Sequence, residues 1–384
     1  MIYEHNSEHS QKGTTFMKAA RHVLYTFLSI ILLLTAGCGG NINTAVRKAV
    51  AAELDPLKSL DPDEAYSYLS QTELFHDDSW SPDMSSTEEV KDVFSLFFKN
   101  FDYEILSADI SDDGKTASAS VRLKTIDAKS LSKDFASSSL RESIEDEAAG
   151  ESSKMTTEER YLLLNHLLKT GEYEFTESDC TLRLSKTDAG WRVNHTSVLE
   201  NQLVGGLITW LSDSYILTPE ETLNIYLNTI RKMNIDDLCN YLGIAELINN
   251  SDDTLSSIYN AMAEQAHEHF NYEVLGSTIN KSSAEVEARI TSFDSDAIMD
   301  NYHSQMDAYL GTADAVIDGA ETRLTHSREL LLRCLDENTA VNDSNITFNL
   351  KNDGVSWKLT DPGKAFGDAL FGSIEIDETY DQTN

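Results

Sequence analysis

The chain has 384 residues, of which 30 are basic and 65 are acidic, and its formal net charge at pH 7 is −35. A surface this acidic repels the phosphates of nucleic acids, so the composition argues against a nucleic-acid-binding protein. The length is sufficient for two domains of ordinary size. With only four cysteines, the chain is not a disulfide-dense scaffold.

Residues 1–37 have the features of a secretory leader, and we exclude them from the predicted fold. Lys18 and Arg21 supply positive charge, and the apolar run Val23–Leu34 is too short to cross a bilayer as a stable helix. Residues 1–16 fit no part of such a leader. We therefore interpret them as an over-extended start.

The segment after the apolar run resembles the lipobox of bacterial lipoproteins. It reads Leu-Thr-Ala-Gly-Cys-Gly-Gly, with Gly37 and Cys38 at the predicted cleavage site. The resemblance implies that Cys38 carries a diacylglyceryl thioether and holds the chain at the extracytoplasmic face of the cell membrane. Two acyl chains anchor a protein stably, whereas one is marginal. Residues 38–42 would then be a short spacer. The alternatives are an ordinary signal peptide or an uncleaved anchor.

An internal repeat follows the leader. The segment Phe101–Leu106 (Phe-Asp-Tyr-Glu-Ile-Leu) recurs as Phe270–Leu275 (Phe-Asn-Tyr-Glu-Val-Leu), 169 residues later. After each copy, apolar and polar residues alternate with a period of two, over 116–123 and 284–290. This alternation is typical of a half-buried antiparallel strand.

Each half contains a second predicted hairpin and then a helix rich in small residues. The turns, Asp-Ala-Gly and Asn-Asp-Gly, accept a positive φ at low cost. The predicted strands are 180–184 and 191–193 in the first half, and 346–350 and 357–359 in the second; the closing helices contain 203–207 and 369–373.

Predicted helices complete each half in the same order, with three before the first hairpin and two between the hairpins. We expect them at 46–57, 63–69, 87–99, 130–147 and 157–168, and again at 220–233, 236–242, 254–267, 296–310 and 321–335. The pattern predicts two tandem repeats, 43–211 and 219–375, and an acidic tail, 376–384.

Helices grouped against antiparallel hairpins predict an α+β fold. The order of elements is similar to that of the NTF2-like, or cystatin-like, superfamily, in which helices pack on a curved antiparallel sheet. This resemblance implies a pocket between each sheet and its helices. Tyr103 and Tyr272 occupy the same position of the repeat and would line it. The alternative is an aromatic core ridge with a hydroxyl at its rim.

Two segments only superficially suggest metal sites. His267 and His269 are two residues apart, whereas helical metal ligands are three or four apart, and the dipole at a helix C-terminus accounts for both histidines. The segment Asp109–Gly114 lacks the glutamate that a calcium loop needs at its twelfth position, so a hairpin turn is expected. We predict no metal and no cofactor.

The cysteines beyond Cys38 are Cys180, Cys239 and Cys334, an odd number. Cys239 and Cys334 are candidates for a disulfide, and three buried free thiols are the alternative.

Three functions are open at this point. The preferred one is a membrane-anchored, non-enzymatic lipoprotein that binds a small apolar ligand or another envelope protein, since the repeat carries no duplicated catalytic constellation. The second is an isomerase or dehydratase, which needs a carboxylate or histidine within hydrogen-bond reach of a pocket tyrosine. The third is the solute-binding lipoprotein of a transporter, although such proteins usually alternate single strands and helices.

Overall fold

The structure is a computed structural model that describes residues 42–59, 74–75, 88–151, 154–249, 251–360 and 363–376. The predicted leader, Cys38, the helix expected at 63–69 and almost all of the acidic tail lie outside these residues. The chain forms two compact units, which we describe separately. Unit 1 contains residues up to 56 together with 103–122 and 179–195, and unit 2 contains 57–102, 123–178 and 196–384.

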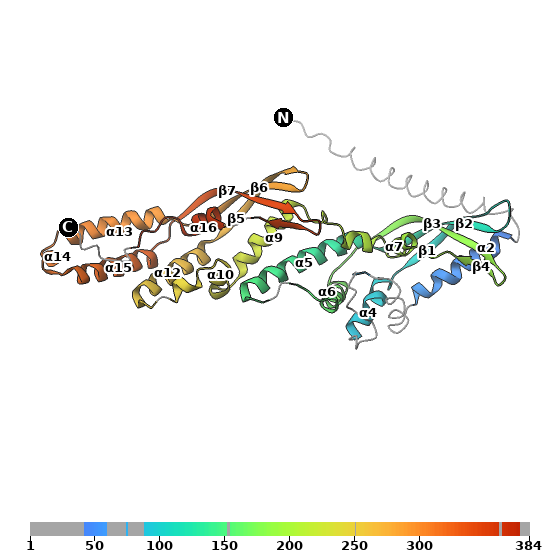
Figure 1. Ribbon diagram of the computed structural model, residues 1–384, viewed down its shortest axis with the longest axis horizontal. Helices are drawn as coiled ribbons and strands as arrows, with labels where there is room; N and C mark the ends of the chain where they lie inside the picture. Colours follow the sequence, from blue (N-terminus) through green and yellow to red (C-terminus); the bar gives the residue numbers. More distant parts are fainter. Residues whose placement is uncertain are drawn as a thin grey trace, which may run out of the picture. The chain divides into compact units, whose positions relative to one another are not determined.

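Two four-stranded antiparallel sheets have their strands in chain order (Figure 1). The combination of these sheets with packed helices confirms the predicted α+β class. The first sheet contains β1 (Asp102–Ile110), β2 (Thr116–Ile126), β3 (Phe175–Thr187) and β4 (Gly190–Val193), and the second contains β5 (Asn271–Asn280), β6 (Ser283–Phe293), β7 (Val341–Asn352) and β8 (Trp357–Leu359).

The period of two in the sequence determines which face of each long strand is buried. In β6, Val286, Ala288 and Ile290 are fully buried, whereas the intervening Glu285 and Glu287 are exposed. β6 pairs with β7 without interruption from Ser283–Lys351 to Phe293–Val341. Because side chains alternate across a strand, a slip of one residue would move this apolar set into solvent.

Unit 1 places a single helix, α2 (Ile42–Leu54), on its sheet. Val46, Val50 and Leu54 are fully buried and recur every four residues, so they form one stripe along the helix. α2 packs against β4, and a short 3-10 helix, η1 (Asp55–Lys58), follows it.

Unit 2 contains the other helices of the described chain. They are α4 (Glu88–Phe97), α5 (Ala128–Ala149), α6 (Thr157–Thr170), α7 (Ser197–Leu203), α8 (Leu207–Leu211), α9 (Pro219–Lys232), α10 (Ile235–Tyr241), α11 (Ala245–Ile248), α12 (Asp253–His269), α13 (Ser295–Leu310), α14 (Ala313–Ile317), α15 (Ala320–Asp336) and α16 (Gly363–Phe371). Among these described elements, none has the length and apolar composition that crossing a bilayer would require.

The structure divides the helix expected around 203–207 into α7 and α8. Gly205 and Gly206 lie between them with φ of +60° and +83°, a conformation that glycine adopts at low cost. A Cβ atom on Gly205 would lie 2.6 Å from Oγ1 of Thr125. The small residues of this segment therefore permit a sharp turn and a close approach to β2, rather than a continuous helix.

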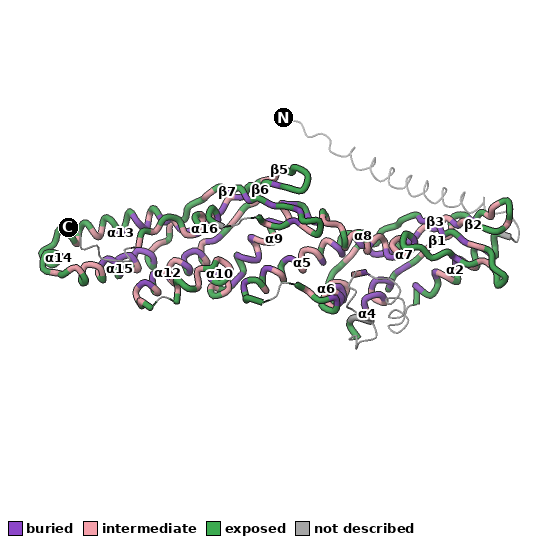
Figure 2. Tube along the Cα trace, in the orientation of Figure 1, coloured by how far each residue is buried: buried purple, intermediate pink, exposed green. Residues whose placement is uncertain are grey.

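α5 contributes to the core around the second sheet. Its residues Leu140, Ile144 and Ala148 join the cluster that contains Leu223 and Leu227 of α9 and the inner face of β5–β8. Buried positions recur along both helices in Figure 2. A separate core joins α12, α13 and α15. The packing of α5 on α9 and α10 is what positions the site described next.

Candidate functional site

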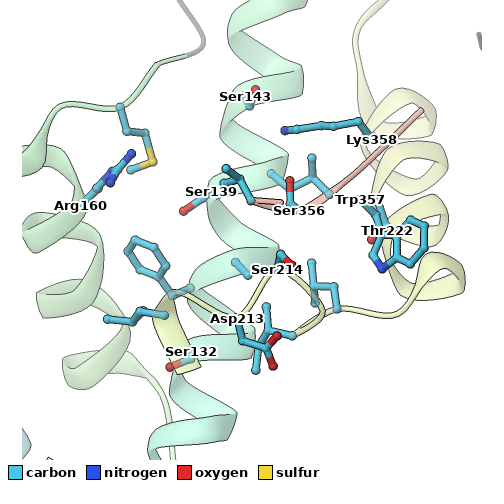
Figure 3. Close-up of a pocket in the computed structure, with 18 of the residues that line it drawn as sticks. Ser132, Ser139, Ser143, Arg160, Asp213, Ser214, Thr222, Ser356, Trp357 and Lys358 are labelled. Atoms are coloured by element: carbon cyan, nitrogen blue, oxygen red, sulfur yellow. The ribbon is translucent and has the colours of Figure 1, made fainter. Parts of the chain in front are cut away.

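A cavity of about 280 Å³ lies within unit 2, between α5, the start of α6, the α8–α9 connection and the turn before β8 (Figure 3). This volume is near the lower end of the roughly 300–1,000 Å³ that small-molecule sites occupy. The lining residues are Phe75, Ser132, Phe135, Ala136, Ser139, Leu140, Ser143, Lys154, Met155, Arg160, Leu211, Asp213, Ser214, Ile216, Leu217, Thr222, Val355, Ser356, Trp357 and Lys358.

One face of α5 forms the central wall of the cavity. Ser132, Ala136, Ser139 and Ser143 recur at intervals of three or four residues, which places them on the same side of the helix. The hydroxyl of Ser132 donates to the carbonyl of Ala128 at 2.8 Å. In the described part of the chain, the hydroxyl of Ser139 is the one buried side-chain polar atom that has no hydrogen-bond partner.

Aromatic side chains supply the apolar surface. The ring of Phe75 stacks on Phe135 with centroids 5.5 Å apart and meets Tyr161 edge-on at 5.2 Å. On the β8 side, Trp357 is buried and Tyr215 packs against it edge-on at 5.7 Å. The cavity is thus bounded by ring surfaces from two directions, which favours a ligand with an apolar portion.

Three cationic side chains line the cavity together with one carboxylate. Arg160 is half-buried, whereas Lys154 and Lys358 are exposed at the rim. Asp213 accepts a hydrogen bond from the backbone N–H of Tyr215 at 2.9 Å, so it is engaged by its own loop. The lining carries a net positive charge in a chain whose overall charge is strongly negative.

A hydrogen-bonded turn holds the β8 side of the cavity in place. The buried Asn352 donates from its amide to the carbonyl of Ser214 at 2.7 Å and accepts from the N–H of Gly354 at 2.9 Å. The Asp353 carboxylate accepts from the N–H groups of Ser356 and Val355, and these hydrogen bonds lower the pKa of Asp353. The turn is thereby joined to the α8–α9 connection, which forms the adjacent wall.

The opposite walls are joined by the start of α9. Thr218 and Glu221 form a capping box, and an ion pair links Glu221 to Lys133 of α5. The adjacent Thr222 is buried and donates to the carbonyl of Thr218 at 2.9 Å. These contacts fix α9 against α5, so the separation of the cavity walls is set by a well-defined helix terminus.

The tyrosines predicted from the repeat lie elsewhere. Tyr103, in β1 of unit 1, donates to the Asp55 carboxylate at 2.7 Å. Tyr272, in β5 of unit 2, donates to Oδ1 of Asn224 at 2.9 Å, and burial raises its pKa although Arg231 opposes the shift. Neither tyrosine lines the cavity of Figure 3. A pocket at their position remains a prediction.

The equivalence of the two tyrosines extends to their hydrogen-bond partners. Asp55 and Asn224 are also 169 residues apart; Asp55 lies directly after α2, and Asn224 lies within α9. In both cases a half-buried phenol is tied to a polar side chain of that neighbouring segment. The predicted duplication of 43–211 and 219–375 is still a prediction, and this shared contact accords with it.

The remaining candidate residues have structural partners. His267 lies in the last turn of α12, and its Nε2 is 2.9 Å from the carbonyl oxygen of Met233. Among the described residues, no group of side chains could hold a metal ion. The segment Asp109–Gly114 contains the turn between β1 and β2, where the Ser111 hydroxyl bonds to the Asp113 carboxylate at 2.6 Å. Cys180, Cys239 and Cys334 are buried free thiols, so Cys239 and Cys334 form no disulfide.

Comparisons with known proteins identify no family for this chain. No family model matches it, and no curated protein does. One solved structure that does match is described as "a putative lipoprotein (ycdA)" from Bacillus subtilis. It is 11% identical, and the match covers 71% of this chain and 96% of that one with a TM-score of 0.26. A likeness this weak carries no argument about fold or function.

Proposed function

We propose that this protein is a lipid-anchored, non-enzymatic binding protein of the cell envelope, attached to the extracytoplasmic face of the membrane through Cys38, and that it binds a small molecule in the cavity of unit 2. The anchor is supported by the small residues before Cys38 and by the short apolar run that precedes them. The binding role is supported mainly by the composition of the cavity wall.

The cavity combines aromatic walls with hydroxyl groups and cations, which is the usual composition of a small-molecule site. Its described lining contains no histidine, cysteine or tyrosine, and its one carboxylate, Asp213, is held by a backbone N–H. Proton transfer needs an acid or base with free access to the substrate. Binding therefore fits this lining better than acid–base catalysis does.

The anchor is tested by metabolic labelling with a radioactive fatty acid in a bacterium that processes lipoproteins. We expect the chain to carry label and to fractionate with membranes, and Cys38→Ala to abolish both. Cys180→Ala is the matched control, because it removes a buried thiol and should leave labelling unchanged. An unlabelled, freely soluble native chain would refute the anchor.

The binding role is tested by extracting the natively purified protein and identifying small molecules by mass spectrometry. Ser143→Trp should fill the cavity and eliminate any co-purified molecule. Ser137→Trp is the matched control, because Ser137 is a half-buried serine of the same helix that lies outside the lining. If both variants retain the same molecule as the parent chain, the cavity is not its binding site.

A further inference from the structure

The cavity is lined by three cations and one carboxylate, in a chain that has 65 acidic residues to 30 basic ones. Within the described part of the chain, Arg160, Lys154 and Lys358 take part in no ion pair, although Lys358 is close enough to the Asp353 carboxylate to help lower its pKa. The lining itself therefore carries a net positive charge, which favours an anionic ligand over a cationic one.

Arg160 is the best placed of the three to bind an anion. Its guanidinium lies over the ring of Phe75, 5.6 Å from the centroid, and Phe75 in turn stacks on Phe135. An arginine guanidinium presents its N–H groups as a planar fork, which matches the geometry of a carboxylate or phosphate. Because Arg160 is half-buried, bulk salt screens its charge less than that of an exposed lysine.

Figure 3 shows how the charged and polar groups surround α5. Arg160 comes from α6 on one side, Lys358 extends from β8 on the other, and Ser139 and Ser143 lie on the helix between them. The unpaired Ser139 hydroxyl makes the free protein less stable, since a buried hydroxyl without a partner loses its hydrogen bonds to water and gains none in the fold. A polar group that costs stability is expected at functional sites.

The apolar surface of the cavity is adjacent to these groups. Trp357 is almost fully buried, at 2% exposure, and Leu217 and Leu140 are buried beside it. A small inorganic anion would use the cations of the lining alone, and a neutral hydrocarbon would use its apolar residues alone. The complementary ligand therefore has two parts.

We propose that the cavity binds a small amphiphile with one anionic head group, in which the head is held by the guanidinium of Arg160 and the apolar part contacts Phe135 and Trp357. This inference rests on the proposed function, because it specifies the ligand class of the same cavity. A volume of about 280 Å³ suits a short or medium-length apolar part rather than a complete phospholipid.

Calorimetric titration of the mature chain tests the two-part ligand. The probes are octanoate and octyl phosphate, which differ in the anion, 1-octanol, which lacks it, and inorganic phosphate, which lacks the chain. We expect at least one of the two anionic amphiphiles to bind, and 1-octanol to bind at least roughly tenfold more weakly, since hydrogen bonds to charged groups are worth about 1.5–3 kcal/mol. Phosphate alone should not bind. Equal affinity for octanoate, octyl phosphate and octanol would overturn the proposal.

Variants test which residue holds the head group. Arg160→Gln should weaken binding of the anionic amphiphile by at least roughly tenfold and leave the weak binding of octanol unchanged. Arg141→Gln is the matched control, because Arg141 is an exposed arginine of α5 outside the lining. If Arg160→Gln folds poorly, Lys358→Gln replaces an exposed rim cation and should still reduce anion affinity by a smaller factor. Unchanged anion affinity in a folded Arg160→Gln would overturn the assignment, as would unchanged affinity in Lys358→Gln if Arg160→Gln does not fold.

Ser139→Ala provides a second readout with opposite signs. Removal of the unpaired hydroxyl should raise the melting temperature of the free protein and lower affinity for the anionic amphiphile. A stabilised variant with unchanged affinity would exclude Ser139 from the head-group site. Failure of the whole inference is distinguishable from failure of the proposed function: if Ser143→Trp eliminates a co-purified molecule and no probe binds, the cavity is a binding site for another ligand class.

Discussion

Gly372 allows a sharp test of how the end of α16 is packed. Its φ is +61°, and a Cβ atom at this position would lie 2.0 Å from Oγ and 2.4 Å from Cβ of Ser295, the first residue of α13. The backbone N–H of Ser373 donates to the same Oγ at 3.2 Å. The left-handed conformation costs an L-residue about 1–2 kcal/mol, and forced overpacking costs a further ~1–3 kcal/mol. We therefore expect Gly372→Ala to lower the free energy of unfolding by about 2–5 kcal/mol.

This loss is a large part of the roughly 5–15 kcal/mol that stabilises a typical domain. Urea and thermal unfolding of the mature chain, followed by circular dichroism, should show it as a lower midpoint, by roughly 2–4 °C for each kcal/mol in thermal unfolding. Gly354→Ala isolates the conformational cost, because Gly354 has φ of +93° but no atom within 4 Å of the added Cβ. Gly367→Ala, in α16 itself and equally uncrowded, should instead stabilise the helix by about 0.5–1 kcal/mol.

The double variant Gly372→Ala with Ser295→Gly removes the atoms that clash and should recover the overpacking part of the loss. The reasoning fails if Gly372→Ala destabilises the protein no more than Gly354→Ala does. It also fails if the double variant is no more stable than Gly372→Ala alone, because the loss would then have another origin than the contact with Ser295.

Three further outcomes follow from local contacts. Thr218→Ala removes the capping box with Glu221 and should cost about 1 kcal/mol in urea unfolding; an unchanged midpoint would contradict it. The pKa of Asp252 is lowered, mainly because its carboxylate accepts a hydrogen bond from the N–H of Leu255. The ionised carboxylate therefore stabilises the fold above pH 3.8, its ordinary pKa, and this stabilisation is lost as the pH falls through the lower pKa of the folded state. Asp252→Ala should thus be less stable than the parent at pH 7, with a gap that narrows at acid pH; a constant gap would refute this. Burial raises the pKa of Cys180 to about 11, and all three remaining cysteines are buried. A Cys38→Ala chain should therefore react slowly with Ellman's reagent until urea exposes the three thiols. A thiol that reacts fast in the native protein would contradict this burial.

The element pattern was largely predictable from the sequence because its signals are local. The alternation of Val286, Ala288 and Ile290 with charged residues predicts which side of β6 is buried, whatever it packs against. Local signals also mark helix starts: Thr156 caps α6 through Glu159, and Pro219, at the first position of α9, has a φ that suits a helix start. The prediction of one continuous helix around 203–207 was wrong because Gly205 and Gly206 adopt a positive φ. The sequence pattern of small residues does not show which of its glycines take this conformation.

The cavity was not predictable in the same way. Its walls come from segments as distant as Phe75 and Lys358, and only the packing of α5 on α9 brings them together. A retrospective signal exists in α5, where Ser132, Ser139 and Ser143 occupy positions on one face that apolar residues would fill in a fully packed helix. The sequence prediction named Tyr103 and Tyr272 instead, because it was based on positions that recur in the repeat. The residues that line this cavity do not recur in that way.

By itself, therefore, the sequence determined the α+β class, two hairpins in each half, the buried faces of β2 and β6 and the expectation of a lipid on Cys38. These features depend on backbone conformation, side-chain alternation and a short processing motif, all of which act over a few neighbouring residues. Only the tertiary structure decided that α5 joins the core of the second sheet and that Arg160 lies beside Phe75 with no acidic partner in the described chain. Such placements depend on contacts between residues far apart in the chain, whose free energies are set by packing and charge in three dimensions.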